Sequence, residues 1–486
     1  MPTPRKAIAP TTEAIDHFCN HFDDLFVRSE EREAVRQYLI GLLLPREHNK
    51  TIVELAAIVP GARRQALHHF LHDAPWDADA LNARRLELWR AHPWLGPHGQ
   101  GVLILDETGD PKRGSRIELA AQQYLGKLGH VANGVVAVTS HWADGTRHVP
   151  VGVKPYRPAG RLPRGRKDPA FHTKPDLAWQ LIEEARAAQI PFHLVVADSV
   201  YGENAQLESR LFAAKIAYVM GLRPSHGTWQ VVEDEAHPPA FTPAEAAQRL
   251  PRSAWVRTVR YDTHGKELVR YTAELELGTT YGPTRGVRLI AATLDPATLK
   301  PESTWYLATS LTLEEASPAV VYEWYRLRDW VEHFYKPVKH ELGWADYQMR
   351  PERAIVRHWQ LVLLAYTFSL LVGALPPAAD QPTDQPTDQA GKKTGRDGWS
   401  ARRMAGDTAP GAGVALPLGS AADLLATLVE QRSTARAGRA PRPSRPRPPT
   451  GSPPPRRPYL TNQRLVGVTG ARATYRAGYK RGEARQ

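Results

Sequence analysis

The chain contains very little sulfur: its 486 residues include one cysteine, Cys19, and four methionines. A single cysteine cannot form an intrachain disulfide or build a cysteine-based zinc site, and it fits a reducing cytoplasm. The nineteen histidines show neither an H-E-x-x-H pattern nor paired zinc spacing, and no G-x-x-x-x-G-K-[ST] phosphate loop is present. These absences exclude a disulfide scaffold, and no motif indicates an ATP-driven motor.

Long apolar runs are also scarce. The first thirteen residues lack the apolar segment of a signal peptide. The only long apolar stretch, from Trp359 to Leu375, contains Gln360 and directly follows Arg357 and His358. Because the stretch is slightly short for a bilayer, we predict a buried core helix and no membrane association.

Acidic residues are nearly missing from the end of the chain. Residues 431–486 hold thirteen arginines, one lysine and one acid, whereas the other 430 residues carry 49 basic and 50 acidic groups. The net charge of +12 therefore belongs to this tail and is not evidence that the folded domains bind DNA. We predict that residues 376–486, rich in proline and arginine, are largely disordered apart from a short helix at 420–430. The tail either adds nonspecific DNA affinity or is merely solubilising.

The spacing of apolar residues divides the rest of the chain. Residues 1–98 are predicted to form a helical domain. From Gly101, consecutive strand patterns and then alternating helix and strand patterns predict an α/β core in two parts, 99–222 and 301–375. Three alternating segments between them predict a β-rich insertion at 223–300.

One pair of predicted helices has the lengths and the intervening turn residues of a helix-turn-helix. Thr51–Val59 and Arg63–His72 are separated by Pro60-Gly61-Ala62. Arg63 and Arg64 stand at the start of the second helix, where a recognition helix would meet DNA. The alternative is an ordinary helical hairpin with a solvated basic face.

Two acids directly follow apolar strand patterns. Asp106 follows Val102–Leu105, and Asp198 follows His193–Ala197. An acid at the carboxyl end of a buried strand points into the crevice where open α/β sheets bind ligands. With Glu332, which lies in a predicted helix, they would form the cage of three acids that Mg²⁺ or Mn²⁺ prefers. Taken alone, an acid at the end of a strand is more often a cap or a salt-bridge partner.

The predicted helix carries a polar stripe. At about 100° per residue, Tyr325, Arg328, Glu332 and Lys339 fall within roughly 60° of one another, although Pro337 weakens the last step. Arginine, lysine and a tyrosine hydroxyl there could hold phosphate oxygens. The alternative is an exposed helix face with an Arg328–Glu332 ion pair.

Several other residues near the predicted site are either alternatives to its acids or have two possible roles. Strand alternation sends Glu107 to the side opposite Asp106, and Asp110 lies further along the same strand. Trp330 is interpreted as a core residue rather than a base-stacking one. A basic loop either contacts phosphates or is simply solvated; its members are Arg157, Arg161, Arg164, Arg166 and Lys167.

Tyr-x2-Arg-x3-Glu-x6-Lys, from Tyr325 to Lys339, resembles the signature around the third acid of DDE transposases of the insertion-sequence-4 type. The chain is most similar to the insertion-sequence-701 family, over roughly residues 15–375. The other stretches that carry the resemblance, in the family's order, are Tyr38–Leu44, His69–Trp76, Leu105–Lys112 (LDETGDPK), Gln123–Gly129 (QYLGKLG), Thr173–Pro175 (TKP) and Asp198–Gly202 (DSVYG).

The resemblance implies a ribonuclease-H-like catalytic core and a cut-and-paste DNA transposase. It implies that Asp106, Asp198 and Glu332 are the catalytic residues and hold two Mg²⁺ or Mn²⁺ ions, with Asp106 bridging both. The expected partners are the element's terminal inverted repeats, target DNA and a second copy in a synaptic dimer, in the cytoplasm at the nucleoid. The alternatives are a domesticated DNA-binding protein that does not cleave and a related nuclease without strand transfer.

Overall fold

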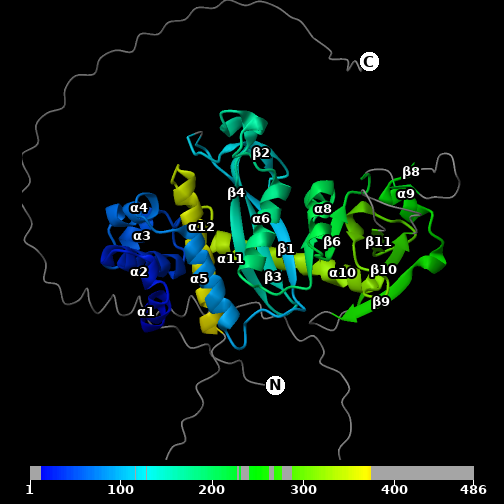
Figure 1. The fold of residues 1–486 in the computed structure, drawn as a ribbon, viewed down its shortest axis with the longest axis horizontal. Coiled ribbons are helices and arrows are strands. Elements are labelled where there is room, and N and C mark those ends of the chain that lie inside the picture. Colours follow the sequence, from blue (N-terminus) through cyan, green and yellow to red (C-terminus); the bar gives the residue numbers. More distant parts are fainter. Residues whose placement is uncertain are drawn as a thin grey trace, which may run out of the picture. The chain divides into compact units, whose positions relative to one another are not determined.

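The computed structural model describes residues 12–373 except Ser115, Lys127, 227–228, 231–239, 262–266 and 276–286. The predicted tail and its helix at 420–430 lie outside the described residues. The described part is a mixed α/β structure in which a group of helices precedes one large sheet (Figure 1).

The first part of the chain is helical, as predicted. Its elements are α1 (Thr12–Asn20), α2 (Ser29–Leu43), α3 (Ile52–Ile58), α4 (Arg64–His72) and α5 (Ala78–Ala91). Side-chain caps fix two of the starts: Thr51 accepts a hydrogen bond from the Glu54 amide, and Asp77 accepts one from the Asp79 amide.

A late helix, α12 (Glu352–Gly373), completes the core of these helices. By length and composition it is the one described helix that could cross a membrane, yet 72% of that window is buried inside the protein. It packs against α2, α4, α5 and β4 (His148–Tyr156). The buried Tyr38 hydroxyl and His358 Nδ1, 2.7 Å apart, form a hydrogen bond between α2 and α12. The apolar stretch predicted as a core helix is therefore one in the structure.

The first half of the sheet begins with β1 (Val102–Pro111), which pairs antiparallel with β3 (His130–Ala143) and parallel with β5 (Leu194–Ala197). β3 pairs with β4 as a hairpin, and β6 (Tyr218–Leu222) lies parallel to β5. The short β2 (Ala121–Leu125) pairs with the beginning of β3. The order β4-β3-β1-β5-β6 is consistent with a ribonuclease-H-like core.

The same sheet continues beyond β6. β12 (Thr304–Thr309) pairs antiparallel with β6, and β11 (Arg288–Thr293), β10 (Glu267–Leu275) and β9 (Val256–Tyr261) follow as an antiparallel ladder. In the segment predicted as a β-rich insertion, β9, β10 and β11 thus continue the core sheet, which has ten strands in the described part of the chain. It also carries α9 (Pro243–Gln248) and the small β7–β8 pair (Trp229–Gln230 and Ala240–Phe241).

Strand alternation decides what covers each face of the sheet. Leu103 and Leu105 pack toward α6 (Lys174–Ala187) and its neighbours α7 (Ser199–Gly202) and α8 (Ala205–Ala213). Val102 and Ile104 face the other way, toward α10 (Pro318–Arg326) and α11 (Trp330–His340). Figure 1 shows α10 and α11 running in succession across the sheet. Asp106 therefore faces α10 and α11, and Glu107 faces α6.

Candidate active site

Two of the predicted acids meet where parallel pairing ends. The last parallel pair of β1 and β5 is Leu105 with Ala197, so Asp106 and Asp198 are the next residues on the two strands. β1 continues along β3 to Pro111, which places Asp106 in mid-strand and not at a strand end. Asp198 leaves the sheet and caps α7, where its Oδ1 accepts a hydrogen bond of 2.9 Å from the Val200 amide.

Arg328 lies between these acids. Its Nη2 is 3.7 Å from Asp106 Oδ1 and 3.5 Å from Asp198 Oδ2. Burial raises the pKa of Asp106 to about 7, an effect that Arg328 opposes and Asp198 reinforces. Burial lowers the pKa of Arg328, but the two carboxylates outweigh it, so the pKa lies above its ordinary value. The guanidinium is therefore the counter-charge of the acid pair.

Tyr325 reaches the same point from α10. A Cβ added to Gly221, on β6, would lie 2.7 Å from the Tyr325 hydroxyl oxygen, so this position has room for glycine and little else. Burial, reinforced by Asp198, raises the pKa of Tyr325 to about 12. Its protonated hydroxyl is a donor beside the acid pair.

Glu332 is not brought to the acids, because the helix changes its pitch. Leu327–Asp329 forms a 3-10 turn between α10 and α11. A 3-10 turn rotates about 120° per residue, so three residues move the following helix roughly 60° out of the predicted phase. Glu332 is exposed and makes no hydrogen bond or ion pair with any described residue. Within the described ranges, no three His, Cys, Asp or Glu side chains are grouped to hold a metal ion.

Lys339 forms an ion pair inside the fold. Its Nζ lies 2.7 Å from Asp110 Oδ1 and 3.4 Å from the Gly109 carbonyl oxygen on β1. Only 12% of the Lys339 side chain and 5% of the Asp110 side chain are exposed. In this conformation the ammonium neutralises a buried carboxylate and is not free to hold a phosphate.

Two buried tyrosines beside the acids were not singled out from the sequence. The Tyr335 hydroxyl is 2.6 Å from Thr139 Oγ1, and Thr139 is the partner of Asp106 across β1 and β3. Tyr201 lies behind the acids on α7 and is fully buried. The sequence signal that could have identified them is their spacing: Tyr335 is three residues after Glu332, and Tyr201 is three residues after Asp198.

Arg63 and Arg64 lie on the helical pair and not at the acids. The turn contains Gly61 at φ +78°, Arg63 precedes α4, and both arginines are exposed. Behind them, Arg357 of α12 donates to the carbonyl oxygens of Leu71 and Ala74, 3.0 and 2.7 Å away. The pair is thus anchored on α12 with its basic end facing outward.

Of the remaining candidate residues, some make contacts within the fold and others are exposed on the surface. Trp330 is partly buried and packs on the core under α10 and α11, as interpreted from the sequence. Arg157 pairs with Glu352, and Arg161 donates to the Ala120 carbonyl oxygen at 2.5 Å. The exposed basic residues of the loop are Arg161, Arg164, Arg166 and Lys167.

The acid pair fits a divalent cation by its donor chemistry. Asp106 and Asp198 supply carboxylate oxygens, and the pair already surrounds one positive charge, the Arg328 guanidinium. A cage of three acids would need Glu332 to turn inward.

Comparison with known proteins agrees with this geometry. Residues 17–266 match the family described as DDE superfamily endonuclease, and residues 172–368 match the Transposase DDE domain. The fold and the acid pair thus define a DDE nuclease core, a class whose domains generally use divalent metal ions. The chain is 33% identical over 355 residues to the probable transposase for insertion sequence element IS701 of Microchaete diplosiphon, covering 72% of this chain and 85% of that protein. It belongs to the DDE transposases, enzymes that cleave DNA.

Proposed function

We propose that this transposase cuts and joins the ends of an insertion sequence by a cut-and-paste route, using two Mg²⁺ or Mn²⁺ ions held by Asp106, Asp198 and Glu332. The observation that carries the proposal is the pair of partly buried aspartates around Arg328, just after the last parallel pair of β1 and β5. Bound divalent ions would activate a water or a DNA hydroxyl and stabilise the leaving oxygen.

The chain's own residues would bind and orient the phosphodiester. The Arg328 fork, once released from the acids, suits a phosphate oxygen pair. The Tyr325 hydroxyl, held over Gly221, would donate to another phosphate oxygen. Lys339 would contribute a phosphate contact only after leaving Asp110.

Recognition of the element ends is proposed for the helical domain of residues 1–98, with Arg63 and Arg64 in a groove of the duplex. Exposure of both arginines on an anchored helix pair supports this role. The working assembly would be a homodimer that holds two ends and the target DNA at the nucleoid. The segments 223–300 and 376–486 would be an insertion and a disordered tail with no part in the chemistry.

The acids are tested by nicking of a labelled element end in Mg²⁺. Asp106→Asn, Asp198→Asn and Glu332→Gln should each abolish nicking while binding to the end persists in a gel-shift assay. Glu183→Gln, which changes an exposed glutamate on α6, is the matched control and should nick normally. Near-normal nicking by any of the three acid variants removes that residue from the site.

Strand joining needs its own measurement. Transfer of a cut end into a target plasmid separates a transposase from a nuclease that only cleaves, and absence of both reactions would leave a DNA-binding protein. For end recognition, Arg63→Ala/Arg64→Ala should reduce binding to the element end more than binding to random duplex. Substitution is a better test than truncation, because α1 to α5 share a core with α12.

A further inference from the structure

Three of the sequence stretches that resemble the family meet on the face of β1 opposite Asp106. LDETGDPK supplies Glu107, TKP supplies Lys174 at the start of α6, and DSVYG supplies Tyr201 on α7. Lys174 Nζ lies 2.6 Å from Glu107 Oε1. About a fifth of each side chain is exposed, 22% for Lys174 and 20% for Glu107. The proposed chemistry on the other face of the sheet uses none of these residues.

This cluster contains a donor and an acceptor that lack partners. Glu107 Oε2 and the Tyr201 hydroxyl oxygen are both buried, and neither has a hydrogen bond within the described residues. Burial raises the pKa of Tyr201 well above its ordinary value, and the next largest contribution comes from the charge of Glu107. The phenol therefore stays protonated in the field of that carboxylate. Buried polar groups without partners cost free energy and call for an explanation.

Each member is linked to one of the acids through the backbone. The Glu107 amide donates to Asp106 Oδ1 at 2.8 Å. The Tyr201 amide donates to the Asp198 carbonyl oxygen at 3.2 Å. α7 is also pressed against β6, since a Cβ on Gly202 would lie 2.2 Å from the Gly221 carbonyl oxygen. Movement of Glu107 or Tyr201 must therefore alter the acid in front of it.

We propose that Glu107, Lys174 and Tyr201 form a positioning site for the acid pair. The Lys174–Glu107 ion pair fixes the peptide that joins Asp106 to Glu107, and the Tyr201 hydroxyl closes onto Glu107 Oε2 when the acids take up a divalent cation. This inference rests on the proposed function. Outer partners that orient metal ligands change metal affinity by about 10–100-fold in other sites.

The test is the metal dependence of Glu107→Gln, Lys174→Met and Tyr201→Phe in the full chain. Mn²⁺ concentrations that shift the melting temperature and Mg²⁺ concentrations that give half-maximal nicking should both rise about tenfold. The maximal nicking rate at saturating metal should change less. Lys174→Arg, which keeps the charge, should restore most of the affinity.

Tyr201→Phe is the sharpest of these variants. Because its hydroxyl has no hydrogen-bond partner among the described residues, removing it should leave the melting temperature measured without added metal unchanged or slightly higher. If Tyr201 had only a structural role, Tyr201→Phe would not change the affinity for Mn²⁺. Weaker Mn²⁺ binding by a fully stable Tyr201→Phe protein supports positioning, and unchanged Mn²⁺ binding overturns it.

The Lys154–Glu184 pair offers a matched control. It also joins the sheet to α6, from β4, and it does not contact the acids. Lys154→Met should leave metal dependence at the wild-type value. The inference fails if Lys174→Met behaves like Lys154→Met, or if Lys174→Met loses affinity for DNA with normal metal dependence. Wild-type protein that binds Mn²⁺ but never nicks DNA would refute the proposed function. The Mn²⁺ affinities of the variants would still show whether the positioning site exists.

Discussion

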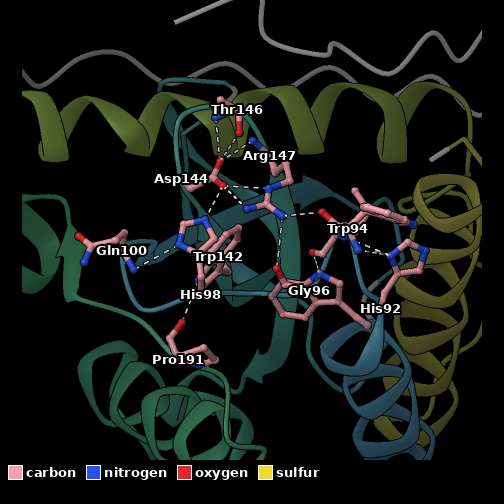
Figure 2. A network of polar contacts seen from close by, with 12 residues as sticks. His92, Trp94, Gly96, His98, Gln100, Trp142, Asp144, Thr146, Arg147 and Pro191 are labelled. Carbon is pink, nitrogen blue, oxygen red and sulfur yellow. Dashed lines mark hydrogen bonds and ion pairs between the residues drawn. The ribbon is translucent and has the colours of Figure 1, made fainter. Parts of the chain in front are cut away.

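Asp106 and Asp144 are two largely buried aspartates of the same strand pair, and the fold treats them in opposite ways: Asp106 lies in mid-strand on β1, whereas Asp144 follows the end of β3. Asp144, in the turn between β3 and β4, accepts hydrogen bonds from the Thr146 amide and hydroxyl and from three Arg147 nitrogens, at 2.7 to 2.9 Å (Figure 2). His98 Nε2 lies 3.0 Å from it. Asp106 accepts one backbone hydrogen bond, and its nearest cation is 3.7 Å away.

The pKa values record this difference. Burial alone would raise the pKa of Asp144, but the hydrogen bonds from Thr146 and Arg147 lower it to about 2. Burial raises the pKa of Asp106 to about 7, because few donors compensate it. The fold therefore gives Asp144 many hydrogen-bond donors and gives the Asp106 carboxylate few, so the Asp106 oxygens are available for a ligand.

The Asp144 network serves the fold. Arg147 Nη1 donates to the Trp94 carbonyl oxygen at 2.9 Å, which ties the segment between α5 and β1 to the hairpin. Trp142 Nε1 donates to the Pro191 carbonyl oxygen at 2.9 Å, just before β5. Figure 2 shows these contacts converging around Asp144 and Arg147. Many polar contacts thus surround Asp144, whereas Arg328 is the cation that lies between Asp106 and Asp198.

The largest expected effect comes from making Asp106 neutral. Asp106→Asn should lower the nicking rate by roughly 10³-fold or more, since metal-ion stabilisation contributes several kcal/mol. Its free energy of unfolding should stay equal or rise by about 1–2 kcal/mol, because burial of the charge is relieved. Urea denaturation and the nicking assay measure the two quantities. A strongly destabilised Asp106→Asn protein would contradict the contrast with Asp144.

Lys339→Met sharpens the comparison, because it leaves a third buried acid, Asp110, without its partner at the acid end of the sheet. Breaking a buried pair from one side should cost about 3 kcal/mol of stability. Adding Asp110→Asn should recover much of that loss. Lys336→Met, an exposed lysine of the same helix, should change little. Denaturation curves that show no cost would make Lys339 a free, DNA-facing cation.

Asp144→Asn should do the reverse of Asp106→Asn. The pKa shift from 3.8 to about 2 corresponds to about 2 kcal/mol of stability, with nicking per folded molecule unchanged. Because the folded-state pKa is depressed, this contribution is present above pH 3.8 and disappears as the pH falls toward 2. The stability gap between wild type and variant should therefore close over that pH window. Asp295→Asn, an exposed turn aspartate, should show a much smaller gap at pH 7.

The smallest effect is expected from removing the basic tail. A chain ending after Glu430 should cleave a bound end at nearly the normal rate at saturating protein. Its affinity for random duplex should fall, most at low salt, where unscreened charge counts most. Fluorescence anisotropy at several salt concentrations measures this change. Full affinity at low salt would show that the tail is merely solubilising, and loss of cleavage would give it a part in the chemistry.

The acid pair could be predicted because its signals are local. Each apolar run ending in aspartate predicted a strand, and parallel strands bring such residues together at one level of the sheet. The orientation of Glu107, on the face opposite Asp106, followed from strand alternation in the same way.

Other features depend on contacts that no local pattern contains. The stripe from Tyr325 to Lys339 assumed one uniform helix, but the helix tightens where it crosses the sheet, and Leu327 there packs against the Gly145 turn. Lys339 meets Asp110 only because α11 ends over β1. That β12 joins β6 could not be foreseen either, since alternation predicts strands and not their partners.

The packing of α12 on the first helices also determines when their shared core can form during synthesis of the chain. α2 ends at Leu43, but α12 begins at Glu352, so their shared core stays open while about three hundred residues are made. At about 5–20 residues per second, that interval lasts roughly 15–60 s on the ribosome. During it, the apolar faces of α2 and α4 lack their largest partner and need protection from other chains. The helix pair that carries Arg63 and Arg64 thus becomes rigid only after the whole catalytic sheet has been synthesised.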